Sequence, residues 1–120
     1  MFERVCQHAL PALIPKTYRG IGYWWHNRHE IDVVGLATDG TLVAGECKYT
    51  SREMTEGDLA DLEQSTAQVQ WTPATGADRE EHYCCFCRSG FSDDLQQIAA
   101  NRDDVSLFTP GDIVPNGAAE

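Results

Sequence analysis

Four charged residues interrupt two apolar segments on either side of a predicted turn: Glu30 and Asp32 precede the turn, and Glu46 and Lys48 follow it. Strands that are apolar on both faces are normally buried, and a carboxylate that leaves water without a partner is costly. These charges therefore need compensation. A salt bridge and a bound divalent cation are the two candidates, and carboxylate oxygens suit Mg²⁺ or Mn²⁺.

The length of the turn decides whether the two acids meet. A two-residue turn would place Asp32 opposite Cys47 and direct the two carboxylates to opposite faces of the hairpin. A three-residue loop over residues 38–40, ending in a glycine in the left-handed conformation, places Asp32 opposite Glu46 instead. Lys48 then leaves the strand on the same face. We predict the three-residue loop, because it gathers the charges.

The predicted cluster suits hydrolysis of a phosphodiester. Asp32, Glu46 and the backbone carbonyl of Cys47 would bind the cation, because two carboxylates so close together cannot both ionise cheaply without one. Lys48 would orient the attacking water, help to remove its proton and stabilise developing negative charge. Glu30, opposite Lys48 in this register, is either its ion-pair partner or part of the site. The alternative for the whole cluster is a structural set of ion pairs, which leaves a negative charge unbalanced.

The rest of the sequence predicts an α/β domain that can position this cluster. The predicted elements are, in chain order, a helix over residues 2–14, a strand over 20–26, the hairpin within 29–50, a helix from a Thr55–Asp58 capping box to about Trp71, a strand over 82–89, a helix from Ser92 and a strand over 105–109. A three-stranded meander followed by helical crossovers predicts a mixed sheet flanked by helices, in the order αβββαβαβ. We expect one domain over residues 1–110 and a mobile C-terminal tail over 111–120.

The motifs resemble those of the PD-(D/E)XK nuclease superfamily. In the segments EIDVVGL and GECK, Asp32 matches the first acid of the superfamily, and Glu46-Cys47-Lys48 match its E-x-K. More narrowly, GYWWHNRHEIDVVGL followed by GECKYT resembles the nuclease-like C-terminal domain of archaeal AAA-type ATPases, a relative of the archaeal Holliday junction resolvases. The resemblance covers residues 1 to about 110, and it implies a restriction-endonuclease-like fold and DNA as the substrate. Ile31 replaces the superfamily's proline, a variation that the superfamily tolerates.

The resemblance also implies further site residues. Glu3 matches the glutamate that the superfamily often adds to the metal site from its first helix, although an acid also suits a helix start. Gln64 matches a glutamine on the second helix, although the helical periodicity also allows a solvated position. Tyr49 and Arg28 are expected beside bound DNA.

Two functions from different classes fit these residues. The first is a Mg²⁺-dependent or Mn²⁺-dependent DNA endonuclease. The second is a non-catalytic, nuclease-like interaction module, either the C-terminal part or a remnant of an archaeal ATPase. The chain contains no GxxxxGK[ST] phosphate-binding loop, so a domain of the ATPase family would here stand alone or have lost its motor, with an ATPase as a candidate partner. A homodimer is expected from the resemblance to the resolvases.

The charge of the chain is strongly negative and uneven. The net charge is −10; residues 1–50 hold five acids and five bases, and residues 51–120 hold fourteen acids and four bases. Such acidity argues against nonspecific binding of nucleic acid in ordinary salt, since phosphate contacts depend on Lys and Arg. Acidic surfaces are also a general adaptation of halophilic proteins, in which they do not exclude DNA. No apolar run is long enough for a membrane span, and we expect a cytoplasmic protein.

The cysteines and tryptophans carry weaker signals. We expect all five cysteines to be reduced thiols. Cys84 and Cys87 with His82 could form part of a zinc or iron–sulfur site, but strand positions 84 and 87 face opposite ways. Trp24 and Trp25 also alternate, so one should pack in the core and one outside, where stacking of a nucleic-acid base is an alternative role.

Overall fold

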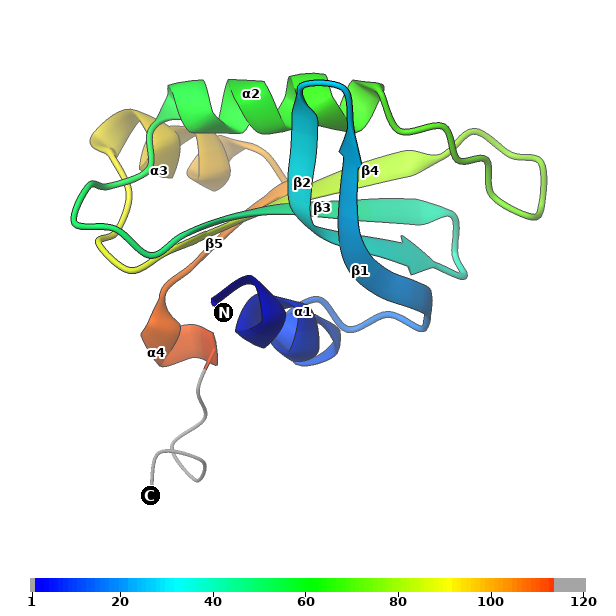
Figure 1. Ribbon diagram of the computed structural model, residues 1–120, viewed down its shortest axis with the longest axis horizontal. Coiled ribbons are helices and arrows are strands. Elements are labelled where there is room, and N and C mark those ends of the chain that lie inside the picture. The colour runs from blue at the N-terminus through cyan, green and yellow to red at the C-terminus, as the bar shows by residue number, and fades with distance from the viewer. Residues whose placement is uncertain (1, 114–120) are drawn as a thin grey trace.

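The computed structural model describes residues 2–113 and is built around a mixed five-stranded sheet in the order β1-β2-β3-β4-β5 (Figure 1). The elements, in chain order, are α1 (Phe2–Leu13), β1 (Tyr18–His26), β2 (His29–Ala37), β3 (Thr41–Lys48), α2 (Glu56–Ala67), β4 (Glu80–Cys87), α3 (Asp93–Asn101), β5 (Val105–Phe108) and α4 (Pro110–Ile113). Strands β1 to β3 form an antiparallel meander, and β3 to β5 are parallel, joined by α2 and α3. The predicted mixed α/β fold is confirmed.

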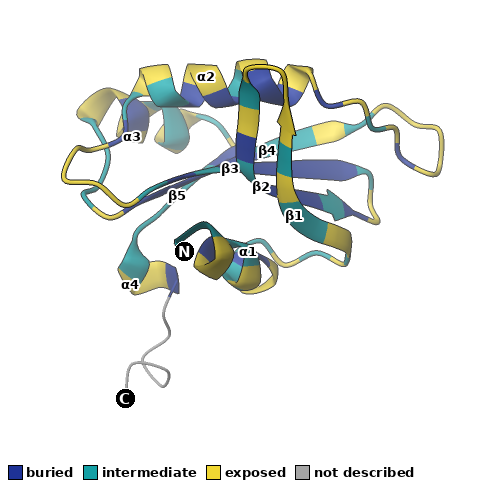
Figure 2. Ribbon diagram, viewed as in Figure 1, coloured by how far each residue is buried: buried dark blue, intermediate teal, exposed yellow. Residues whose placement is uncertain are grey.

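The two faces of the sheet carry separate apolar cores. On one face, α2 and α3 pack Leu59, Leu62 and Leu95 onto the sheet, and on the other face α1 packs Cys6 and Leu10. Residues 83–87 of strand β4 are buried from both sides, which agrees with the apolar sequence YCCFC of this part of the strand (Figure 2). Among residues 2–113, no helix is both long and apolar enough to cross a membrane.

The cysteines lie within these cores. All five are free and buried, as predicted. Cys84 belongs to the core under α1, whereas Cys87 belongs to the core under α2 and α3. The side chains of these two residues therefore lie on opposite faces of the sheet, and His82 contacts Ser106 at 2.8 Å. This arrangement does not gather the three groups of the zinc alternative.

The β2–β3 hairpin has the predicted register. Residues 38–40 form a three-residue loop in which Gly40 has a φ of +94°. The ladder pairs Val33 with Gly45 and continues to Leu36 opposite Leu42. The side chain of Asp39 accepts the N–H of Thr41 at 3.0 Å and thereby closes the loop. The next pair along this register would be Asp32 and Glu46, but the pairing of the two strands ends just before it, at Val33 and Gly45.

Several predicted boundaries shift. Strand β1 begins at Tyr18 rather than at residue 20, β4 covers Glu80–Cys87 rather than 82–89, and β5 ends at Phe108 rather than at residue 109. The second helix ends at Ala67 rather than near Trp71, because the chain turns there while Val69 still packs in the core. The first helix ends at Leu13, one residue earlier than predicted. The expected tail is wrong for its first residues: residues 110–113 form α4, and Ile113 is 7% exposed because it packs against the core under α1. The rest of the expected tail, residues 114–120, lies outside the described residues.

Arg79 ties the end of α2 to β4. Its guanidinium donates to the carbonyl oxygens of Thr66 at 2.9 Å, Val69 at 2.6 Å and Trp71 at 3.3 Å, and to Glu81 Oε2 at 2.9 Å. Carbonyl groups at a helix C-terminus have no partner within the helix, so a cation that reaches several of them is stabilising.

Replacement of Arg79 by Ala is expected to lower the free energy of unfolding by about 2 to 4 kcal/mol, because the substitution removes charge-assisted hydrogen bonds to partly buried acceptors. Urea unfolding measures this loss. Arg19→Ala is the matched control, because Arg19 is an exposed strand residue. Its side chain makes no hydrogen bond or ion pair within residues 2–113. Equal midpoints for the two variants would contradict the assigned role of Arg79.

Candidate active site

A cleft forms where β2 separates from β3. The β1–β2 pairing continues to His26 opposite His29, whereas the β2–β3 pairing ends at Val33 opposite Gly45. The tip of the β1–β2 hairpin rises toward α2 (Figure 1), where His29 Nδ1 lies 3.1 Å from Ser65 Oγ. The cleft between hairpin, β3 and α2 has a volume of about 350 Å³, and it is lined by Arg28, His29, Glu30, Asp32, Glu46, Asp61, Leu62, Gln64 and Ser65.

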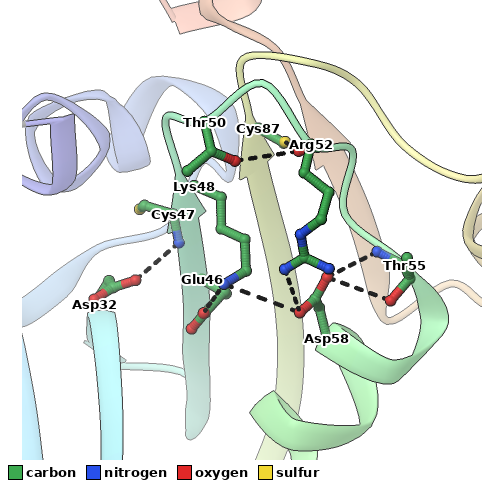
Figure 3. Close-up of polar contacts among 9 residues, drawn as sticks. All are labelled: Asp32, Glu46, Cys47, Lys48, Thr50, Arg52, Thr55, Asp58 and Cys87. Carbon is green, nitrogen blue, oxygen red and sulfur yellow. Dashed lines mark hydrogen bonds and ion pairs between the residues drawn. The ribbon is translucent and has the colours of Figure 1, made fainter.

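Asp32 and Glu46 both face this cleft from adjacent strands. Asp32 Oδ2 accepts the backbone N–H of Cys47 at 2.9 Å (Figure 3). The carboxylate of Asp32 thus accepts a hydrogen bond from an N–H group that lies beyond the end of the β2–β3 pairing. The N–H and C=O of one strand residue point to the same side, so the Cys47 carbonyl also points toward β2. Two carboxylates and one main-chain oxygen are thus directed to the same end of the hairpin.

The two carboxylates lack sufficient positive charge around them. Burial raises the pKa of Asp32; the N–H of Cys47 lowers it, and the negative charges of Glu3 and Glu30 raise it further. Burial, followed by the charge of Asp32, raises the pKa of Glu46 to about 7, although Lys48 acts in the opposite direction. A cation between the two carboxylates would remove this repulsion.

Lys48 lies between two acids on the same face of the sheet. Its Nζ is 3.6 Å from Glu46 Oε2 and 4.0 Å from Asp58 Oδ1 (Figure 3). Asp58 stands in the first turn of α2, where its Oδ2 accepts the N–H of Thr55 at 2.9 Å. Arg52 NH2 lies 4.0 Å from Asp58 Oδ1. The sequence predicted Asp58 only as a helix cap, and the crossover from β3 to α2 brings it beside the cluster.

The donor set fits a divalent cation that retains ligands from solvent or substrate. Within residues 2–113, no group of three Asp, Glu, His or Cys side chains stands close enough to hold a metal ion by itself. Mg²⁺ is commonly bound by one or two carboxylates and keeps several waters. Asp32, Glu46 and the Cys47 carbonyl correspond to that mode of binding.

The other predicted site residues lie either on α1, beside Asp32, or in the lining of the cleft. The charge of Glu3 acts on Asp32, and Gln7, one turn further along α1, donates from Nε2 to the main-chain oxygen of Asp32 at 2.9 Å. Helix α1 therefore passes beside the cluster. Arg28 and Gln64 both line the cleft, and Gln64 does so although it is exposed, as its helical position indicated.

One sequence-based prediction is wrong in detail. Glu30 was expected opposite Lys48, but its Oε1 accepts the hydroxyl of Tyr23 at 2.7 Å, because the strands have separated at this level. Tyr49 is 58% exposed and lies outside the lining of the cleft, and its expected contact with DNA stays a prediction. Its ring packs 5.1 Å from the ring of Phe2 on α1, since consecutive strand residues point to opposite faces.

Four residues of the cleft region were missed from sequence: Asp58, Asp61, His29 and Ser65. The capping box located the start of α2, and helical spacing placed Asp61 and Ser65 one turn apart. No local pattern could reveal which side of α2 faces the hairpin tip. That orientation depends on how the hairpin bends.

Fold and cleft define this domain as an α/β protein with a nuclease-like fold and an acidic cleft at the divergence of two strands. Residues 1–60 match the family model DUF234, described as archaea bacterial proteins of unknown function, and the chain belongs to this family. No curated protein sequence matches the chain.

A solved structure has the same fold. A repair endonuclease from Pyrococcus abyssi superposes with a TM-score of 0.55 at 16% sequence identity, over 88% of this chain and 45% of that chain. The present chain therefore spans less than half the length of that endonuclease. At this identity the likeness shows a common fold.

Proposed function

We propose that this domain is a Mg²⁺-dependent or Mn²⁺-dependent DNA endonuclease of the PD-(D/E)XK type, related to the C-terminal domain of archaeal ATPases and working with such an ATPase. One observation carries the proposal: Asp32 and Glu46 line one cleft on adjacent strands, and Lys48 stands 3.6 Å from Glu46. Burial, and for Glu46 also the charge of Asp32, raises the pKa of both carboxyl groups, which supports a bound cation as the compensating charge. The fold shared with a repair endonuclease is compatible with this reaction.

Each residue has a distinct role in the proposed hydrolysis. Asp32, Glu46 and the Cys47 carbonyl would hold the cation, with Glu3 assisting from α1. When bound, the cation supplies Lewis-acid stabilisation of the charge that develops on the phosphodiester oxygens. Lys48 orients the attacking water and places positive charge beside the reacting phosphate. Arg28 and Gln64 contact the DNA at the mouth of the cleft.

The charges around the cleft make binding of a DNA phosphate within the cleft depend on the cation. Among its described lining residues, four carboxylates, Glu30, Asp32, Glu46 and Asp61, stand against one arginine, Arg28. A phosphate group that enters this lining alone is repelled. A divalent cation at Asp32 and Glu46 would neutralise these two carboxylates and offer a positive centre to the phosphate oxygens.

A cleavage assay on a panel of branched, flapped, single-stranded and linear DNAs tests the proposal. The assay is run with Mn²⁺, with Mg²⁺ and with EDTA, in high salt because of the net charge of −10. We expect cleavage with either metal and none with EDTA. Calorimetric titration of the metal without DNA is the second measurement.

A non-catalytic interaction module is the second candidate. The observation that favours it is the contact of Lys48 with both Glu46 and Asp58, which resembles a structural ion-pair network. A folded chain that binds neither Mg²⁺ nor Mn²⁺ would support this candidate and would contradict the endonuclease proposal.

A further inference from the structure

A second hollow lies beside the cleft, on the β1 side of the hairpin tip. It has a volume of about 370 Å³ and is lined by Trp24, Trp25, His26, Gln68 and Gln70. The cleft is lined by β2 and by α2 up to Ser65, whereas this hollow is lined by β1 and by residues that follow α2. The His29–Ser65 contact belongs to the lining of the cleft, and His29 pairs with His26, which lines the hollow.

The chemistry of the hollow is that of aromatic faces next to amide groups. Trp24 packs against the core, and its ring centroid lies 6.4 Å from that of His26. Trp25 is 65% exposed, as expected for the outer member of the pair. Its side chain makes no hydrogen bond or ring contact within residues 2–113. Gln68 and Gln70 are exposed and offer both donors and acceptors. An indole face with this exposure contributes little to folding.

An unpaired nucleobase matches this lining. A base has a flat π-face for the indole and a polar edge for amide groups, and stacking of bases on aromatic side chains tolerates any sequence. Among residues 2–113, no Lys, Arg, Asp or Glu lines this hollow. Stacking is therefore a way for a chain of net charge −10 to hold nucleic acid, because it does not depend on phosphate contacts.

The position of the hollow connects it to the cleft. Arg28 lines the cleft and follows His26, which lines the hollow, by two residues in the hairpin turn. A strand whose base stacks at Trp25 can thus pass its backbone over Arg28 toward Asp32 and Glu46. Bases within a duplex already stack on each other, so an unpaired base is required.

We propose that the hollow formed by Trp24, Trp25, His26, Gln68 and Gln70 binds an unpaired base, and that the substrate of the cleft is DNA with a single-stranded portion next to the cleavage point. This inference rests on the proposed endonuclease function for the second of its two parts. The stacking site itself is independent of cleavage.

Binding of a fluorescein-labelled oligothymidylate to the full chain in EDTA tests the stacking site without chemistry. Trp25→Ala is expected to weaken binding about 5- to 150-fold, which corresponds to about 1 to 3 kcal/mol for one stacked base. Trp25→Phe should recover part of the affinity, and Trp25→Leu should not. Tyr23→Ala is the matched control, because Tyr23 is an aromatic residue of the same strand that is 51% exposed but lines neither the hollow nor the cleft. An unchanged thermal melt of each variant shows that folding is intact.

The salt dependence separates stacking from phosphate contacts. The loss caused by Trp25→Ala should be the same at low and high salt, since stacking releases few counterions. A labelled duplex should bind equally to wild type and variant.

Several outcomes would overturn the stacking site. The first is that the wild-type chain does not bind the single strand, and the second is that wild type and Trp25→Ala bind it equally. The third is that sedimentation shows Trp25→Ala to change only the self-association of the chain. The proposed function fails separately. If single-strand binding depends on Trp25 but no metal-dependent cleavage occurs, the stacking site stands and the endonuclease proposal fails. If the protein cleaves plain duplex DNA independently of Trp25, the endonuclease proposal stands and the stacking site fails.

Discussion

Replacement of Asp32 by Asn, Glu46 by Gln or Lys48 by Ala is expected to lower the rate of DNA cleavage by a factor of about 10² to 10⁴ or more. The two carboxylates hold the cation, and the lysine acts on the water, so each substitution removes a different part of one site. Asp32→Asn and Glu46→Gln should also weaken binding of Mn²⁺, whereas Lys48→Ala should largely spare it. Cleavage rates and calorimetric metal titrations of the three variants measure both effects.

Glu30→Gln provides the matched control for these substitutions. Glu30 lines the same cleft, but its carboxylate bonds to Tyr23 rather than to the cluster. This variant should retain most of the cleavage activity and of the metal affinity. Wild-type rates in the Asp32 or Glu46 variant would contradict the catalytic assignment.

The metal-free protein is expected to lose stability between about pH 4.5 and pH 7 because of Glu46. The pKa of this carboxyl group is raised from 4.5 to about 7 in the folded protein, mainly by burial and then by the charge of Asp32. In this window the folded state holds a proton that the unfolded chain has released, so stability is fully present below about pH 4.5 and is lost as the pH rises through 7. The shift corresponds to about 3 kcal/mol. Burial raises the pKa of Asp32 as well, which acts in the same direction.

Glu46→Gln removes this pH dependence. In EDTA at pH 8 the variant should melt above wild type, and at pH 4 the two should melt alike. Mg²⁺ at pH 8 should stabilise wild type and leave the variant largely unchanged, because the cation compensates the charge that the substitution removes. Thermal melts at the two pH values with Mg²⁺ and with EDTA measure all four states. Glu53→Gln, at an exposed position, is the control for the loss of one negative charge.

The opposite result would identify a structural ion-pair cluster. Lys48 contacts both Glu46 and Asp58, and loss of one partner from a buried ion pair costs roughly 3 to 5 kcal/mol. In that case Glu46→Gln and Lys48→Ala would both melt far below wild type at pH 8. The loss would be independent of Mg²⁺, and the interaction module would replace the endonuclease as the proposed function.

Local sequence determined the elements and the register of this domain. The three-residue loop agrees with the glycine at position 40, which takes the left-handed conformation, and with the register that brings the charged residues to one face of the hairpin. Ser92 accepts the N–H of Leu95 at 3.2 Å as a helix cap, and Thr55 with Asp58 begins α2. These features depend on a few neighbouring residues, and local periodicity and capping rules describe them well.

The tertiary structure decided which of these residues meet. The separation of β2 from β3 redirected Glu30 to Tyr23 and opened the cleft. The hairpin tip packs on Ser65, and this contact determines which face of α2 lines the cleft. Gln64 lines the cleft for the same reason. The burial of Ile113 against α1 made a helix from part of an expected tail. Each outcome depends on packing between segments far apart in the chain, for which side-chain spacing within one element carries no information.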